Sequence, residues 1–232
     1  MKTHSRRAIL RSALLGAAGT AAGTLSSACT DSPVDSPGAT PATGSASGGA
    51  PVPPSAVGDA MLLVYFSRAG ENYFNGGRRR LEVGNTEVVA RMIGRLTGCD
   101  VHRIEAADPY PDDYEPTVAR NVREQESDSR PEIANPLTSI ERYDTVVLGS
   151  PIWNVRAPMI MTTFVEGLDF TGKTVHPLTT YAMSGLGTTE RDYAASCPGA
   201  TLGEGLAVRG EEVADAEPAV AAWLRRAGLP TR

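Results

Sequence analysis

The clearest structural signal in this chain of 232 residues is LLVYFSRAGENYFNGGRRRLEVGNTEVVA, residues 62–90. The stretch begins with an apolar run that predicts a buried strand, passes through a glycine- and hydroxyl-rich loop, and ends in a predicted helix. A helix start presents unpaired backbone N–H groups and the positive end of the helix dipole, so it can hold a phosphate. We therefore expect a phosphate cradle at this turn, where Ser67, Asn85 and Thr86 add side-chain hydrogen bonds.

Two common phosphate-binding motifs, G-x-G-x-x-G and G-x-x-x-x-G-K-[ST], are absent after this predicted strand. What remains is SR at residues 67–68 and VGNT at residues 83–86. G-N-T alone is also ordinary chemistry for the first turn of a helix, so a plain capped turn is the alternative. Its position after a buried strand favours the phosphate site.

From residue 61 onward, predicted strands and helices alternate. Strands are expected at residues 61–66, 101–104, 145–150, 175–183 and 206–208. Helices are expected at residues 87–96, 114–126, 157–167 and 188–195, with a last one from near Pro218 to Gly228. The alternation predicts an α/β fold: a doubly wound, five-stranded parallel sheet of order 2-1-3-4-5 with helices on both faces.

The loops after strands one, three and four of such a sheet converge on one ligand site. The loop after the third predicted strand contains Pro151, Ile152, Trp153 and Asn154. The loop after the fourth contains Ser184, Gly185 and Gly187. We expect Trp153 to stack on a flat aromatic ligand, or else to be a surface or core aromatic, and the glycines to let backbone approach that ligand closely.

The split motif at residues 67–68 and 83–86 resembles the phosphate loop of flavodoxin-like proteins, which bind FMN. ADPYPDDY at residues 107–114 and SPIWNVRAP at residues 150–158 are similar to segments of a flavodoxin-like subfamily. The resemblance spans nearly all of residues 61–229, with its motifs in the right order. It implies a flavodoxin-like fold and FMN as the cofactor.

The resemblance also implies which residues bind FMN. The expected phosphate-binding residues are Ser67, Arg68, Gly84, Asn85 and Thr86, and the seven residues of the two loops are expected around the ring. The flavin supplies the redox chemistry, so no residue is expected to be catalytic. The sequence predicts no metal site, because its histidines and cysteines are widely scattered.

The chain departs from the family pattern in two places. Residues 71–82 interrupt the phosphate loop, and we hypothesise that this insertion is a lid over the cofactor. Its arginines at residues 78–80 could dock an acidic partner or screen the phosphate, although a solvated charge run is favoured. Asn154–Val155 replaces a Trp–Gly pair, at a glycine peptide that in flavodoxins can flip toward reduced flavin. We expect Val155 to resist the positive φ of such a flip, and Arg156 to raise the flavin potential if it points at the ring.

The N-terminal region predicts export. Residues 1–28 resemble a twin-arginine signal peptide, with Arg6–Arg7 before an apolar stretch. Cys29 is a candidate lipidation site, and ordinary cleavage nearby is the alternative. Residues 29–58, rich in Ser, Pro, Gly, Ala and Thr, predict a disordered linker before a domain at residues 59–232.

The formal net charge is −5, and removing the basic signal makes it more negative. An acidic domain argues against nucleic acid or an anionic membrane surface as partner, so the only membrane contact expected is an N-terminal lipid anchor. Cys99 and Cys197 are expected to be small buried residues, and a disulfide between them is disfavoured.

These observations predict an exported FMN protein that transfers electrons to an unidentified redox protein or a small-molecule acceptor. The first alternative is an FMN-dependent NAD(P)H quinone-type reductase. The second is a ligand-binding domain that has the fold and no redox function.

Overall fold

The computed structural model describes residues 60–232. The predicted signal peptide, the candidate lipidation site Cys29 and the predicted linker lie outside the described residues. Within the described part of the chain, no helix has the length and apolar character needed to cross a membrane.

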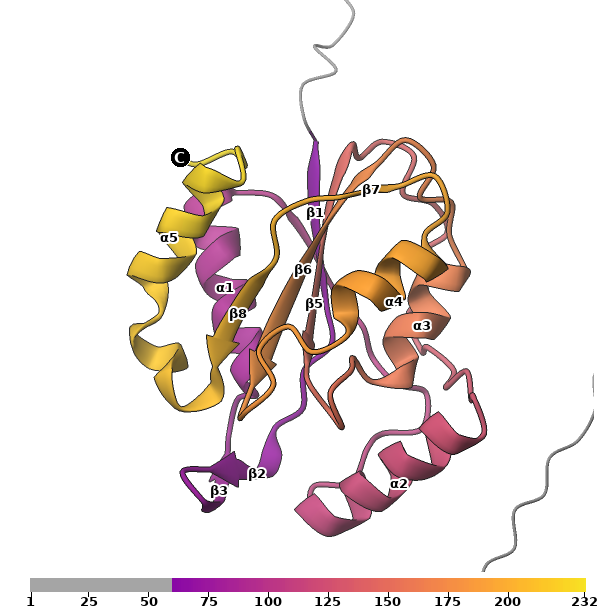
Figure 1. The fold of residues 1–232 in the computed structure, drawn as a ribbon, viewed down its shortest axis with the longest axis vertical. Coiled ribbons are helices and arrows are strands. Elements are labelled where there is room, and N and C mark those ends of the chain that lie inside the picture. Colours follow the sequence, from indigo (N-terminus) through magenta and orange to yellow (C-terminus); the bar gives the residue numbers. More distant parts are fainter. Residues whose placement is uncertain (1–59) are drawn as a thin grey trace, which may run out of the picture. The chain divides into compact units, whose positions relative to one another are not determined.

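The central sheet is parallel, with the order β4–β1–β5–β6, and β7 and β8 lie beside β6 (Figure 1). The strands are β1 (Met61–Tyr65), β4 (Asp100–Arg103), β5 (Thr145–Pro151), β6 (Thr174–Tyr181), β7 (Thr201–Leu202) and β8 (Leu206–Arg209). β7 pairs with the start of β6 and β8 with its end, so these two short strands share the fifth position. The predicted order 2-1-3-4-5 is therefore confirmed.

Helices cover both faces of this sheet (Figure 1). One face is covered by α1 (Asn85–Thr97), the 3-10 helix η1 (Gly210–Asp215) and α5 (Glu217–Arg226). The other is covered by α3 (Met159–Glu166) and α4 (Thr189–Ser196). The remaining helix, α2 (Tyr114–Glu126), lies below α3, near the carboxyl ends of the strands.

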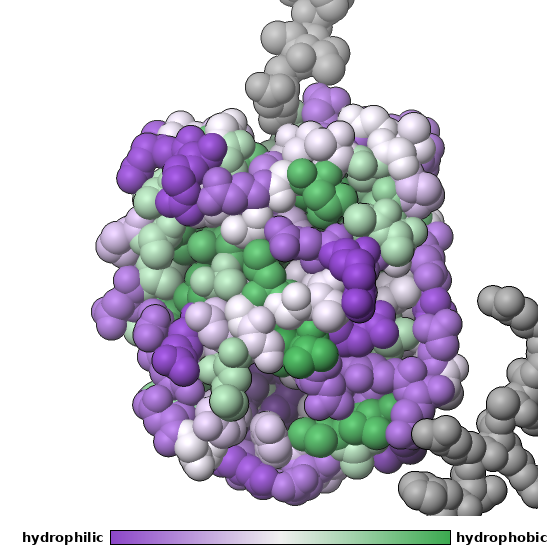
Figure 2. Space-filling view, in the orientation of Figure 1, coloured by the Kyte–Doolittle hydropathy of each residue, from purple (hydrophilic) through white to green (hydrophobic). Residues whose placement is uncertain are grey.

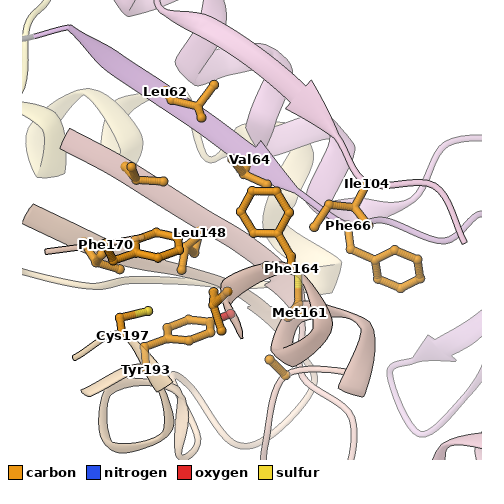
Figure 3. Packing of buried hydrophobic residues seen from close by; sticks show 14 of the residues in the cluster. Leu62, Val64, Phe66, Ile104, Leu148, Met161, Phe164, Phe170, Tyr193 and Cys197 are labelled. Carbon is orange, nitrogen blue, oxygen red and sulfur yellow. The ribbon is translucent and has the colours of Figure 1, made fainter. Parts of the chain in front are cut away.

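Strand β1 explains why its sequence is apolar without alternation. All five of its residues are buried, because the sheet is covered on both sides. Leu62 and Val64 pack toward α3 and α4, in the cluster that Figure 3 shows, whereas Leu63 and Tyr65 pack toward α1 and α5. The strand thus joins two separate hydrophobic cores.

The two cysteines of the domain belong to these different cores. Cys197 lies in the α3–α4 core, and Cys99 packs against the α1–α5 core. Both are free thiols, and burial raises the pKa of Cys197 to about 12. The sheet separates them, so the disfavoured disulfide does not form.

The insertion at residues 71–82 is a β-hairpin. Its strands, β2 (Gly70–Phe74) and β3 (Gly77–Leu81), are antiparallel and lie below α1 (Figure 1). Asn75 and Gly76 form the turn with φ of 47° and 81°. Asn-Gly is the pair most favoured in two-residue hairpin turns, because both positions take positive φ readily.

Candidate functional site

A cavity of about 300 Å³ opens at the carboxyl edge of the sheet, between the hairpin and α2. The space-filling view shows a recess in this part of the molecule (Figure 2). Its walls are formed by the ends of β1, β5 and β6, the start of α1, the hairpin, α2 and the start of η1. The volume falls at the lower end of the range for small-molecule and cofactor sites.

The two halves of the predicted phosphate cradle meet at this cavity, although the hairpin separates them in sequence. Ser67 Oγ accepts a hydrogen bond from the backbone N–H of Glu87, at 3.1 Å. A Cβ at Gly84 would collide with Ser67 Oγ and with the carbonyl oxygen of Arg68, so only glycine fits there. Asn85 and Thr86 line the cavity with the first turn of α1. The positions predicted for a phosphate therefore lie together.

Two further contacts fix the start of α1. Thr86 Oγ1 lies 2.7 Å from Thr180 Oγ1, which connects the helix to the end of β6. The Asn85 amide lies against Gly210, where an added Cβ would come within 2.6 Å of Nδ2. The cradle is thus held between β6 and η1.

Arg68 lines the cavity, but most of its donors point elsewhere. Its guanidinium donates to the carbonyl oxygens of Pro111, at 2.9 Å, Asp112, at 3.0 Å, and Glu71. Burial lowers the pKa of Arg68. Its Nε is buried and has no hydrogen-bond partner among the described residues. Arg68 therefore ties the hairpin to the loop before α2, and its charge remains beside the cradle.

Trp153 lines the cavity and is also part of an aromatic cluster. Its ring meets those of Phe66 and Tyr110 edge to face, with centroids 5.8 and 5.1 Å away. Its carbonyl oxygen accepts a hydrogen bond from Gln125 Nε2 on α2, at 3.1 Å. Trp153 is therefore a wall whose orientation is set by packing against other aromatic rings, and its stacking on a ligand stays a prediction.

Asn154 and Val155 form a tight turn with φ of 50° and 65°. Two backbone hydrogen bonds close the turn. The N–H of Trp153 donates to the carbonyl oxygen of Arg156, at 2.8 Å, and the N–H of Arg156 donates to the carbonyl oxygen of Trp153, at 3.3 Å. The expectation that Val155 resists positive φ is wrong for this turn, because these bonds hold a β-branched residue in a strained region. Pro151, Ile152 and Asn154 line the cavity as predicted.

Ser184, Gly185 and Gly187 are not part of the cavity wall. Gly187 packs under the turn, since a Cβ there would collide with the carbonyl oxygen of Val155. The carbonyl oxygen of Gly185 accepts a hydrogen bond from Thr179 Oγ1, at 2.9 Å. This part of the loop supports the turn, and the residues just before it line the cavity: Tyr181, Ala182 and Met183.

Arg156 does not line the cavity either. Its Nε lies 3.8 Å from Asp192 Oδ2 on α4. Arg156 therefore lies outside the wall of the cavity in which the ring is expected.

The hairpin and its neighbours supply residues that the sequence analysis missed. The hairpin contributes Asn72 and Tyr73, α2 contributes Tyr114, Thr117, Val118 and Asn121, and η1 contributes Gly210 and Glu211. The Asn-Gly pair at residues 75–76 was an available signal for the hairpin. No local signal places residues of η1 at the cavity, because tertiary packing brings them there.

Ion pairs and a stacking contact hold the hairpin against the start of α2. Arg78 pairs with Glu115 on α2 and stacks over the Tyr114 ring, 4.5 Å from its centroid. Arg80 pairs with Asp113, at 3.2 Å. Arg79 instead lies over the Phe74 ring. Two of the three arginines therefore pair with acidic residues of the domain, which leaves less of the positive charge of residues 78–80 for docking an acidic partner.

Comparisons with known proteins bear on the identity of this fold. The model of the flavodoxin family matches residues 81–227. A candidate flavoprotein from Bacteroides eggerthii is 29% identical with a TM-score of 0.58, and the match covers 73% of this chain and 98% of that one. One from Bacteroides uniformis is also 29% identical with a TM-score of 0.58, covering 72% and 99%. A flavoprotein from Lactobacillus acidophilus, in complex with FMN, is 13% identical with a TM-score of 0.47, covering 69% and 99%. No curated protein matches this chain.

Proposed function

The chain belongs to the flavodoxin family, and we propose that it binds FMN and transfers electrons outside the cytoplasm. The observation that carries the proposal is the reassembled cradle: Ser67 and the start of α1 meet beside a cavity of about 300 Å³. A phosphate fits the first turn of α1, where backbone donors and the helix dipole favour an anion.

The rest of the cavity is consistent with the remainder of FMN. Its walls include the aromatic rings of Tyr73, Tyr114 and Trp153, which suit a flat ring system. Two of its residues carry buried polar atoms without a hydrogen-bond partner among the described residues, Arg68 Nε and Glu211 Oε2. Buried polar atoms are normally hydrogen-bonded, so their presence here suits a ligand with polar groups.

FMN, when bound, supplies the one- and two-electron chemistry. The residues of this chain bind and orient it. The backbone N–H groups of Asn85 and Thr86 would hold the phosphate, and Trp153 would position one edge of the ring. The hairpin, through Asn72 and Tyr73, would limit the access of water to the cavity.

An absorption spectrum tests the proposal. The purified protein is mixed with FMN, freed of excess and examined for bands at about 370 and 450 nm, where oxidised flavin absorbs. Retained bands at one flavin per chain are the expected result. A colourless protein with no measurable FMN affinity would refute the proposal and leave a ligand-binding domain.

A quinone-type reductase is the second candidate, and one observation favours it. Tyr73 and Met183 line the cavity yet are 37% and 81% exposed, so the cavity mouth is apolar and accessible. A small aromatic acceptor could approach the ring there. Steady-state oxidation of NADH or NADPH in the presence of a quinone would establish this activity, and its absence leaves electron transfer between proteins.

Export by the twin-arginine route, with or without a lipid at Cys29, is part of the proposal and rests on the N-terminal sequence. Replacing Arg6 and Arg7 by lysine should trap the protein in the cytoplasm. Replacing Cys29 by serine should release exported protein from the membrane fraction if Cys29 is lipidated, and leave its distribution unchanged otherwise.

A further inference from the structure

Glu211, in the first turn of η1, presents a carboxylate to the cavity wall. Its side chain is only 10% exposed. Oε1 accepts a hydrogen bond from the backbone N–H of Asn75, at 3.0 Å, in the turn of the hairpin. Oε2 is buried and has no hydrogen-bond partner in the described part of the chain. The Nε atom of Arg209 forms an ion pair with Oε2 at 3.8 Å, a separation that compensates charge but is beyond hydrogen-bond range.

An unpartnered carboxylate oxygen is costly in a buried position, because it has lost water without gaining a donor. An ionised carboxylate can only accept hydrogen bonds, so the missing partner must be a donor. The cavity is the place from which a donor can come. The unpartnered oxygen and its place at the cavity wall make Glu211 a candidate ligand-binding residue, which was not identified from the sequence.

The position of Glu211 narrows the choice of donor. The residue before it, Gly210, lies against the amide of Asn85 in the phosphate cradle. A phosphate dianion would be repelled by a carboxylate and offers it no proton. The ring, flanked by Trp153, is expected further along the cavity. Between the phosphate and the ring of FMN lies the ribityl chain, whose hydroxyl groups are hydrogen-bond donors.

We propose that Glu211 Oε2 accepts a hydrogen bond from a ribityl hydroxyl of the flavin, while Oε1 holds the hairpin turn over it. The inference rests on the proposed function, because it assumes that the ligand is a flavin. Asn75 and Glu211 are 136 positions apart in sequence, and their bond links the turn of the hairpin to η1. A single carboxylate thus joins ligand and hairpin.

The first test compares two ligands and two variants. FMN and riboflavin share the ribityl chain, and only FMN carries the phosphate. E211Q removes the charged acceptor, yet its amide oxygen can still accept from Asn75. We expect E211Q to weaken binding of both flavins by the same factor, roughly tenfold or more, the range for a hydrogen bond to a charged group. The neighbouring exposed Glu212 provides the matched control E212Q, which should leave both affinities within about twofold.

Two outcomes would overturn the inference while leaving FMN binding intact. If E211Q tightens FMN binding and leaves riboflavin unchanged, Glu211 faces the phosphate. If E211Q changes neither affinity, Oε2 has no donor on the flavin. If the wild-type protein binds neither flavin, the proposed function itself fails, and the inference with it.

The second test needs no variant and remains valid if E211Q fails to fold. Hydrogen exchange at the Asn75 amide is measured on the wild-type protein, alone and with saturating riboflavin or lumiflavin, which has the ring and no ribityl chain. We expect riboflavin to slow this exchange and lumiflavin to leave it unchanged. Equal protection by both ligands would show that the ring, and not the ribityl chain, controls the hairpin, and would overturn the inference.

Discussion

The two walls of the cavity are built on different physical principles. The sheet wall, formed by the strand ends with Ser67, Thr86 and Trp153, stands on strands that are almost wholly buried. The hairpin wall stands on ion pairs between exposed groups: the side chains of Arg78 and Glu115 are 40% and 70% exposed. Burial contributes far more free energy than exposed ion pairs do. The sheet wall is therefore expected to determine both folding and binding, and the hairpin wall binding alone.

The sharpest way to break the sheet wall is G84A. The added Cβ collides with Ser67 Oγ and with the backbone of Arg68, and the backbone has little room to move. We expect a loss of about 1–3 kcal/mol in the free energy of unfolding, the range for overpacking. The same displacement should weaken FMN binding roughly a hundredfold, because several charge-assisted hydrogen bonds change together. Chemical denaturation and flavin titration measure the two effects.

The control for G84A lies on the other wall. At Gly77, an added Cβ meets only the carbonyl oxygen of Phe74, at 3.7 Å, which is ordinary contact. G77A should therefore change the free energy of unfolding by less than about 0.5 kcal/mol. Equal losses from G84A and G77A would contradict the difference between the walls.

Deleting the hairpin tests the same difference between the two walls, now by removing the hairpin wall. Joining Gly70 to Val83 removes Asn72 and Tyr73 from the cavity and leaves both hydrophobic cores intact. We expect the free energy of unfolding to change by less than about 1 kcal/mol, because a two-stranded hairpin is marginally stable by itself. FMN binding should weaken roughly tenfold, the effect of losing about 1.4 kcal/mol of contacts. An unchanged affinity would rule out the lid hypothesis.

The sheet wall could largely be predicted from the sequence, whereas the contribution of the hairpin and η1 to the cavity could not. Strand order and the extent of α2, predicted at residues 114–126 and found at Tyr114–Glu126, follow from periodicity and local chain chemistry. The split cradle could be predicted because both halves lie next to predicted elements. Tyr73 and Glu211 could not be assigned to the site, because the hairpin and η1 reach the cavity only through tertiary contacts. Val155 was misjudged because its hydrogen-bonded turn overrides the preference of the isolated residue.

Substituting the strained Val155, next to the sheet wall, should change the free energy of unfolding by less than G84A does, and in the opposite direction. V155G should raise the free energy of unfolding by about 0.5–1 kcal/mol, since relief of the unfavourable φ outweighs the entropy lost by glycine. Val101, on β4, is similarly exposed, 50% against 55% for Val155. V101G should instead destabilise the domain by about 1 kcal/mol, because glycine is unfavourable within a strand. Thermal or chemical denaturation of both variants is the measurement, and a loss of stability in V155G would show that the turn stores no strain.

The smallest expected effect is a difference in hydrogen exchange between variants of two neighbouring arginines in the hairpin wall, Arg78 and Arg79. Arg78 pairs with Glu115, whereas Arg79 lies over Phe74, 5.0 Å from the ring centroid. R78A should speed hydrogen exchange of the hairpin amides a few-fold, because exposed ion pairs contribute little each. At about 1 M salt, where the screening length falls to about 3 Å, the wild-type protein should approach R78A. R79A should respond much less to salt, since it removes a stacking contact and no ion pair. If R78A and R79A behave alike at both salt concentrations, charge pairing with α2 does not hold the hairpin. Its attachment then depends on three hydrogen bonds between side chains and backbone. The Arg68 guanidinium donates to the carbonyl oxygen of Glu71, the Glu71 carboxylate accepts from the N–H of Tyr114, and the N–H of Asn75 donates to Glu211.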